Sequence, residues 1–60
     1  MSDFLYAIGD DVTEAATGFR GRVVRQIPYN SHAGCRRYVV QPAVGEERTI
    51  DEDLLRASVD

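Results

Sequence analysis

The chain of 60 residues contains no lysine and no tryptophan, a single cysteine and a single histidine. One cysteine excludes an internal disulfide, and Cys35 with His32 supplies only two of the four ligands that a structural zinc ion takes. No apolar run is long enough to span a bilayer, and the short one at residues 4–8 stops at Asp10, which argues against a signal peptide. These absences predict a protein of the reducing cytoplasm, without metal, cofactor or membrane partner.

The short length also limits what the chain can build. Sixty residues form one domain at most, residues 1–60, and bury only about 60% of the surface that the unfolded chain exposes. The apolar fraction of 43% is ordinary for a globular protein, so we expect a folded chain rather than a disordered one. A pocket of about 300 Å³ for a small-molecule substrate has little room here, and we expect no enzyme activity.

Charge is arranged in three blocks along the chain. Residues 1–19 hold four acids and no base, residues 20–37 hold five arginines and no acid, and residues 38–60 hold six acids and two arginines, for a net charge of −3. Every basic residue is arginine, whose planar guanidinium suits bidentate or stacked recognition. Two explanations stay open: a binding role, or the codon usage of a GC-rich genome.

Two strands are clearly predicted, the first from the alternation of apolar and polar residues and the second from the β-prone run Tyr38-Val39-Val40. In the first, residues 19–27, we expect an inner face of Phe19, Gly21, Val23 and Ile27 and an outer face of Arg20, Arg22 and Gln26. Pro28 is expected to end this strand because proline has no amide to donate. The second strand, residues 35–41, is closed by Pro42, and a polar loop at residues 29–34 joins the two.

Weaker signals surround this hairpin. Residues 2–8 read as a strand or a docked arm, residues 11–16 as a strand or a helical turn, and residues 49–50 as a short strand. Asp51 is expected to cap a helical turn over residues 51–55, and a last edge strand is expected through Ala57 and Val59. Short strands hide their apolar face only by curling, and Gly18 and Gly21 lie where the bend is needed, so we expect a small all-β barrel.

Two resemblances add to this interpretation. The segment Gly9-Asp10-Asp11-Val12, followed by Gly18-Phe19-Arg20-Gly21-Arg22-Val23, resembles the opening of SH3-like barrels of the KOW type. It implies an SH3-like barrel of four to five short antiparallel strands, with one helical turn near the C-terminus. The chain as a whole is similar to short bacteriophage and prophage proteins, through its Arg37-Tyr38-Val39-Val40-Gln41-Pro42 segment and its acidic-leucine end. That similarity implies a bacterial host cell or a virion as location, and no activity.

The acidic clusters and the loop residues have ordinary structural explanations. Asp10, Asp11 and Glu14, and the run from Asp51 to Asp53, suit turns and helix caps, and nothing pairs them with a base or nucleophile. His32 has no third group to orient it for catalysis with Cys35. Most of the aromatic residues are expected in the core, and Tyr29 is the one most expected to be exposed.

The arginines carry the functional hypothesis. When the two clear strands pair as a hairpin, their outward side chains form one polar face. The candidate binding residues are those of this face, Arg20, Arg22, Arg37, Gln26 and Gln41, together with Tyr29 and His32 at the tip of the loop. We expect a small non-enzymatic interaction or accessory module that uses this face on a protein partner or on a second copy of itself. The alternative is a nucleic-acid-binding barrel using Arg20, Arg22, Arg25, Arg36 and Arg37. A solvated face with no partner is the third explanation.

Overall fold

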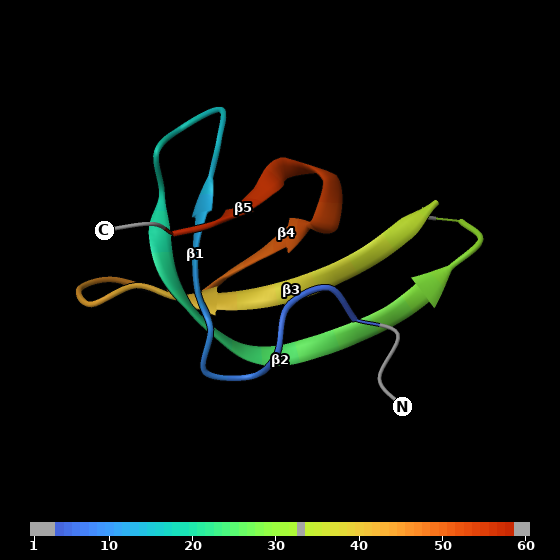
Figure 1. Ribbon diagram of the computed structural model, residues 1–60, viewed down its shortest axis with the longest axis horizontal. Coiled ribbons are helices and arrows are strands. Elements are labelled where there is room, and N and C mark those ends of the chain that lie inside the picture. Colours follow the sequence, from blue (N-terminus) through green and yellow to red (C-terminus); the bar gives the residue numbers. More distant parts are fainter. Residues whose placement is uncertain (1–3, 33, 59–60) are drawn as a thin grey trace.

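The computed structural model describes residues 4–32 and 34–58, which form one antiparallel sheet of five strands (Figure 1). The elements are β1 (Asp11–Glu14), β2 (Arg20–Asn30), β3 (Cys35–Gln41), β4 (Arg48–Asp51), the 3₁₀ turn η1 (Glu52–Leu54) and β5 (Leu55–Ala57). The expected fold class, a small all-β barrel of antiparallel strands with one helical turn near the C-terminus, is confirmed. Within the described ranges there is no helix that is long and apolar enough to cross a membrane.

The strand order β4-β3-β2-β1-β5 leaves β4 and β5 as the two edges of the sheet. The long strand β2 joins the two halves, because its first residues pair with β1 and its later ones with β3. Figure 1 shows how the bending of β2 brings the two edges toward each other, with η1 running between them. The sheet is therefore curled, and a short connection rather than strand pairing links its ends in the part that the structure describes.

Two glycines meet the geometric needs of this curl. Gly18 takes a positive φ of 75° in the β1–β2 turn, a conformation that side chains disfavour. Gly21 lies in extended backbone where β2 passes over the end of β3. A Cβ built at Gly21 would approach the Gln41 carbonyl oxygen to 2.6 Å and Val40 Cγ1 to 2.8 Å. Only a residue without a side chain allows this crossing, so the expected bend at Gly18 and Gly21 has a physical basis.

β2 departs from the expected alternation. The register of β2 on β3 shifts between Val23 and Arg25, which marks a bulge, so Gln26 pairs with Tyr38 on the inner face. The predictions that Gln26 faces outward and Ile27 inward are wrong, because the inserted residue reverses the alternation that follows it. Ile27 pairs with Arg37 instead.

The expected end of β2 at Pro28 is also wrong. The strand continues to Asn30, and its register on β3 shifts a second time between Ile27 and Asn30. Pro28 lies inside that irregular stretch, where the ladder does not require its missing amide hydrogen.

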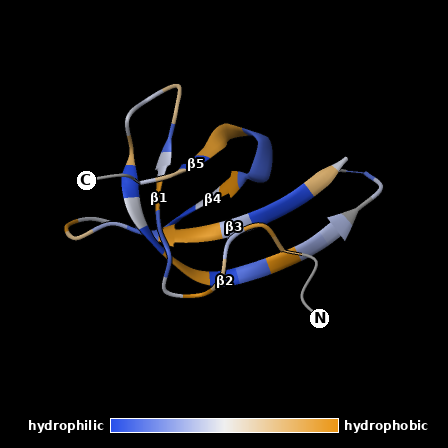
Figure 2. Cartoon of the chain, in the orientation of Figure 1, coloured by the Kyte–Doolittle hydropathy of each residue, from blue (hydrophilic) through white to orange (hydrophobic). Residues whose placement is uncertain are grey.

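Among the residues that the structure describes, seven buried side chains form the core between the two halves of the sheet: Tyr6, Val12, Val23, Tyr38, Val40, Ile50 and Leu55. Residues 4–8, here called the arm, form no strand and lie against the core, so over these residues the docked arm is the correct one of the two alternatives. Residues 2 and 3 of the same prediction lie outside the described residues. Phe4 and Tyr6 contact the Tyr38 ring edge-on, with centroids 5.8 and 5.3 Å away. In Figure 2 the arm, partly coloured as apolar, passes beside the middle of β3.

Polar contacts fix the arm in place. The Tyr38 hydroxyl accepts hydrogen bonds from the amides of Leu5 (3.0 Å) and Tyr6 (3.4 Å). Gln26 Nε2 donates to the Tyr6 carbonyl (2.8 Å), and the Tyr6 hydroxyl donates to the Leu55 carbonyl (3.0 Å). The arm thus ties β2, β3 and β5 together.

The C-terminal elements differ in one detail from the expectation. Asp51 precedes η1, but its side chain makes no capping hydrogen bond, because the carboxylate instead lies 2.9 Å from Arg37 Nε. The expected edge strand through Ala57 is present as β5. Val59 lies outside the described residues.

Candidate functional site

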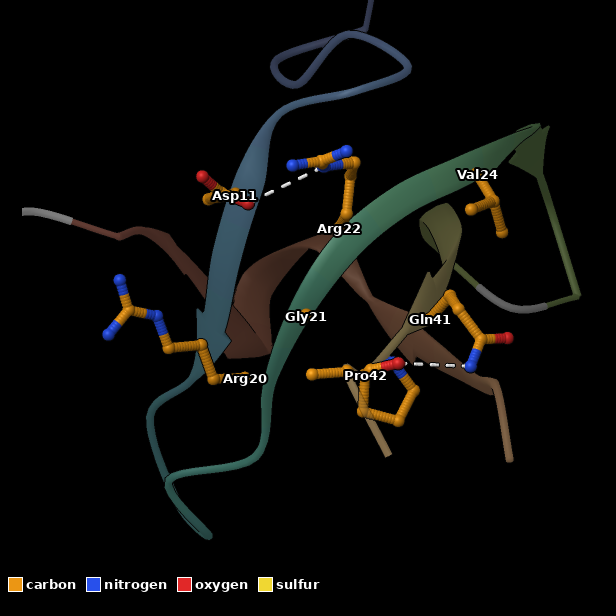
Figure 3. Close-up of a pocket in the computed structure, with 8 residues that line it drawn as sticks. Asp11, Arg20, Gly21, Arg22, Val24, Gln41 and Pro42 are labelled. Atoms are coloured by element: carbon orange, nitrogen blue, oxygen red, sulfur yellow. Dashed lines mark hydrogen bonds and ion pairs between the residues drawn. The ribbon is translucent and has the colours of Figure 1, made fainter. Parts of the chain in front are cut away.

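An open groove of about 680 Å³ lies at the bend of β2, larger than the chain length led us to expect. It is lined by Asp11 of β1, by Arg20, Gly21, Arg22 and Val24 of β2, and by Gln41, Pro42 and Ala43 at the end of β3. Figure 3 shows the lining side chains arranged around Gly21, where the backbone of β2 is bare. The three strands that meet here place side chains from three parts of the sequence in one depression.

The pairing register of β2 with β1 and β3 places Arg20 and Arg22 at the groove. Arg22 pairs with Asp11 on one side and with Gln41 on the other, so these three side chains share the outer face of the sheet. Arg20 lies two residues earlier on the same face. Arg22 Nε is 3.7 Å from Asp11 Oδ1, and the two side chains are 67% and 60% exposed. An ion pair this exposed is weak, so both groups remain accessible to solvent and to a partner.

The apolar part of the groove comes from Val24 of β2 and from the loop that follows β3. Val24 is the inserted residue of the bulge, and it is 42% exposed on the outer side of β2. Pro42 and Ala43 form the opposite wall, where β3 enters the β3–β4 loop. The groove therefore combines cationic and aliphatic surface.

Gln41 shapes the groove by holding that loop. Its Nε2 donates to the carbonyls of Pro42 (3.1 Å) and Gly45 (3.0 Å). These bonds cross the turn that carries Pro42 and Ala43, so the amide of Gln41 positions the wall.

The remaining predicted binding residues lie elsewhere. Gln26 holds the arm on the inner face. Arg37 is on the outer face as expected, but it is ion-paired with Asp51, about 13 Å along β3 from Gln41. Tyr29, 61% exposed, and His32, also exposed, belong to the far end of the β2–β3 hairpin (Figure 1). The structure thus brings together Arg20, Arg22 and Gln41 only.

Two further arginines are engaged in contacts away from the groove. Arg36 Nη1 lies 3.9 Å from a carboxylate oxygen of Glu52. The Arg48 guanidinium stacks 5.0 Å from the centre of the Phe19 ring. Neither adds positive charge to the groove lining.

The acidic clusters have structural contacts. Asp10 accepts a hydrogen bond from the Ala7 amide (2.9 Å), as a turn residue does, and Glu14 accepts one from the Thr17 hydroxyl. Glu52 accepts a bond from the Tyr38 hydroxyl. Among residues 4–32 and 34–58, no three acidic, histidine or cysteine side chains are grouped as they are around a metal ion.

Two buried phenols have shifted acidities. Burial is the main cause that raises the pKa of Tyr38, and the hydrogen bond to Glu52 raises it further. Burial also raises the pKa of Tyr6, with a smaller contribution from the charge of Glu52. Both hydroxyls are protonated donors in the core, and neither faces the groove.

The apolar wall of the groove was missed from the sequence. Val24 continues the alternation of Arg20 and Arg22, so the period-two pattern could have placed it on the outer face, whereas Pro42 looked like a strand terminator only. Comparisons of the chain with protein-family models, with curated proteins and with solved structures gave no match. The function must therefore be argued from the groove itself.

Proposed function

We propose that the protein is a small non-enzymatic interaction module that binds a protein partner through the groove at the bend of β2. The observation that carries this proposal is the combination, in one depression, of an aliphatic wall and two exposed arginines. Protein interfaces favour this composition, because arginine and apolar side chains together provide both orientation and buried area.

Nucleic-acid binding is the weaker alternative. A surface for phosphates needs several cations with few competing carboxylates. Of the five arginines considered for that role, Arg36 and Arg37 lie beside Glu52 and Asp51, and Arg22 lies beside Asp11. The net charge of −3 adds a general repulsion.

Capture from the cells that produce the protein tests the proposal, with two charge-matched variants. The groove variant is Arg20→Gln with Arg22→Gln. The control is Arg25→Gln with Arg56→Gln, which removes two exposed arginines that do not line the groove. We expect a partner that the wild type and the control retain, that the groove variant loses, and that nuclease treatment does not remove.

Equal retention by both double variants would overturn the groove as the binding site. Capture that disappears with nuclease, or direct binding to DNA or RNA that weakens steeply as salt rises, would favour the nucleic-acid alternative. Self-association belongs to the same test, because a second copy of the chain is then the captured partner.

Origin and location complete the proposal. We propose an accessory protein of bacteriophage or prophage, working in the cytoplasm of the host cell or in the virion. The resemblance of the sequence to short phage proteins supports this, and the genes beside its own test it. A position outside any phage or prophage gene cluster would contradict it.

A further inference from the structure

The inference concerns the chemistry of the partner segment and rests on the proposed function. At the groove, Asp11 and Arg22 lie opposite each other on paired strands, with Oδ1 and Nε 3.7 Å apart. Their separation is long for a charge-assisted hydrogen bond, and both side chains are more than half exposed. The Asp11 carboxylate is thus loosely held at a place where the carboxylate of a ligand would meet Arg22.

The cationic side of the groove favours an acidic ligand. Arg20 and Arg22 are on the same face of β2 and about 7 Å apart, which is the repeat along a strand. Acidic residues at alternate positions of an extended peptide have the same spacing. Two guanidinium groups and two carboxylates can then pair along the groove.

The aliphatic side favours an apolar residue close to the two acids. Val24, Pro42 and Ala43 offer carbon surface within the same depression. In an extended peptide the residue between two acids points to the opposite side, so a bend or a flanking residue presents an aliphatic side chain to this wall. The volume of about 680 Å³ suits a few side chains rather than a whole protein surface.

We infer that the groove takes a short acidic and aliphatic segment of the partner protein, and that one of its carboxylates displaces Asp11 from Arg22. Asp11 is then an internal competitor for the ligand. It lowers affinity for acidic segments, and it keeps Arg22 paired when the groove is empty.

A substitution follows that separates this idea from a general charge effect. Asp11→Asn removes the competing carboxylate and keeps the shape of the side chain. Asp53→Asn makes the same change of net charge at an exposed position of η1 that does not line the groove. We expect Asp11→Asn to raise affinity for an acidic peptide roughly two- to five-fold, the size of an exposed ion-pair interaction, and Asp53→Asn to leave it unchanged.

The experiment is an NMR titration of the isotope-labelled protein at low ionic strength. The probe is a blocked peptide that carries two glutamates at alternate positions, with one leucine two positions before the first glutamate and another two positions after the second, so that all four side chains share one side of an extended chain. The matched probe replaces both glutamates by glutamine. We expect the glutamate peptide to move the amide signals of Gly21, Val24 and Ala43, and Arg22→Gln to abolish these shifts. The dispersion of the amide spectrum of each variant reports whether it remains folded.

Equal binding of the glutamine peptide, or an unchanged affinity in Asp11→Asn, would overturn the inference. Absence of any shift with the glutamate peptide would overturn it as well. None of these results decides the proposed function. In the capture experiment a partner of other chemistry could still depend on the groove, and the wild type would still retain it. Loss of groove dependence in the capture overturns both.

Discussion

Replacing Tyr38 by phenylalanine removes one oxygen atom at the point where the arm, β3 and η1 meet. The hydroxyl accepts bonds from the amides of Leu5 and Tyr6 and donates one to Glu52, whose side chain is only 18% exposed. The ring remains, so the two edge-on aromatic contacts survive. The loss leaves two amides and a shielded carboxylate without this partner. Hydrogen bonds to neutral groups contribute about 1 kcal/mol and those to charged groups about 1.5–3 kcal/mol. The bonds to the Leu5 amide and to Glu52 therefore give an expected loss of about 2.5–4 kcal/mol, and the longer 3.4 Å bond from Tyr6 adds little to it.

This loss is large for so small a domain, whose core supplies only about 3–5 kcal/mol of net stability. Urea denaturation followed by circular dichroism measures it, and a control is available in Tyr29→Phe. Tyr29 is 61% exposed, and its hydroxyl has no part in the core, so its loss should change stability by less than about 0.5 kcal/mol. Equal midpoints for Tyr38→Phe and Tyr29→Phe would refute the role given to the Tyr38 hydroxyl.

Three further predictions follow from the same contacts. Gly21→Val places a Cβ 2.6 Å from the Gln41 carbonyl oxygen and should cost more than about 1 kcal/mol in thermal or urea unfolding; a wild-type midpoint would contradict the close crossing of β2 over β3. Because burial raises the pKa of Tyr38 and Tyr6, the contribution of their hydroxyls to stability is complete below their ordinary pKa of 10.0 and is lost as pH rises through the higher pKa of the folded state. A free energy of unfolding that stays constant above pH 10.0 would contradict this. Gln41→Met removes the donor to Pro42 and Gly45, and amide exchange of the β3–β4 loop should accelerate while that of β1 does not.

Much of the fold was predictable from local pattern. The strand of residues 35–41 was placed correctly, because the run Tyr38-Val39-Val40 is strongly β-prone and Pro42 ends it. The arm was predictable only as one of two alternatives, since its docking depends on Tyr38, more than thirty residues away. Asp51 was expected to cap η1, but its carboxylate pairs with Arg37, a contact that exists only because β3 and β4 are neighbours.

The candidate site was predictable in part for a related reason. Arg20 and Arg22 share a face by simple alternation, and pairing with β3 adds Gln41. The bulge at Val24 then reverses the alternation that follows it, which moves Gln26 inward. The aliphatic wall comes from Pro42 and Ala43, where β3 enters the next loop. A bulge arises from packing and strand register, so a period-two pattern alone does not reveal it.

Photo-cross-linking from the groove tests the central claim most directly. Val24 and Leu54 have matched exposures of 42% and 44%, but only Val24 lines the groove, and each can be replaced singly by a photoreactive amino acid in the producing cells. The account predicts a discrete protein adduct from Val24 that Leu54 does not form and that Arg20→Gln with Arg22→Gln abolishes. Adducts of equal yield from both positions, or adducts with nucleic acid from Val24, would contradict it.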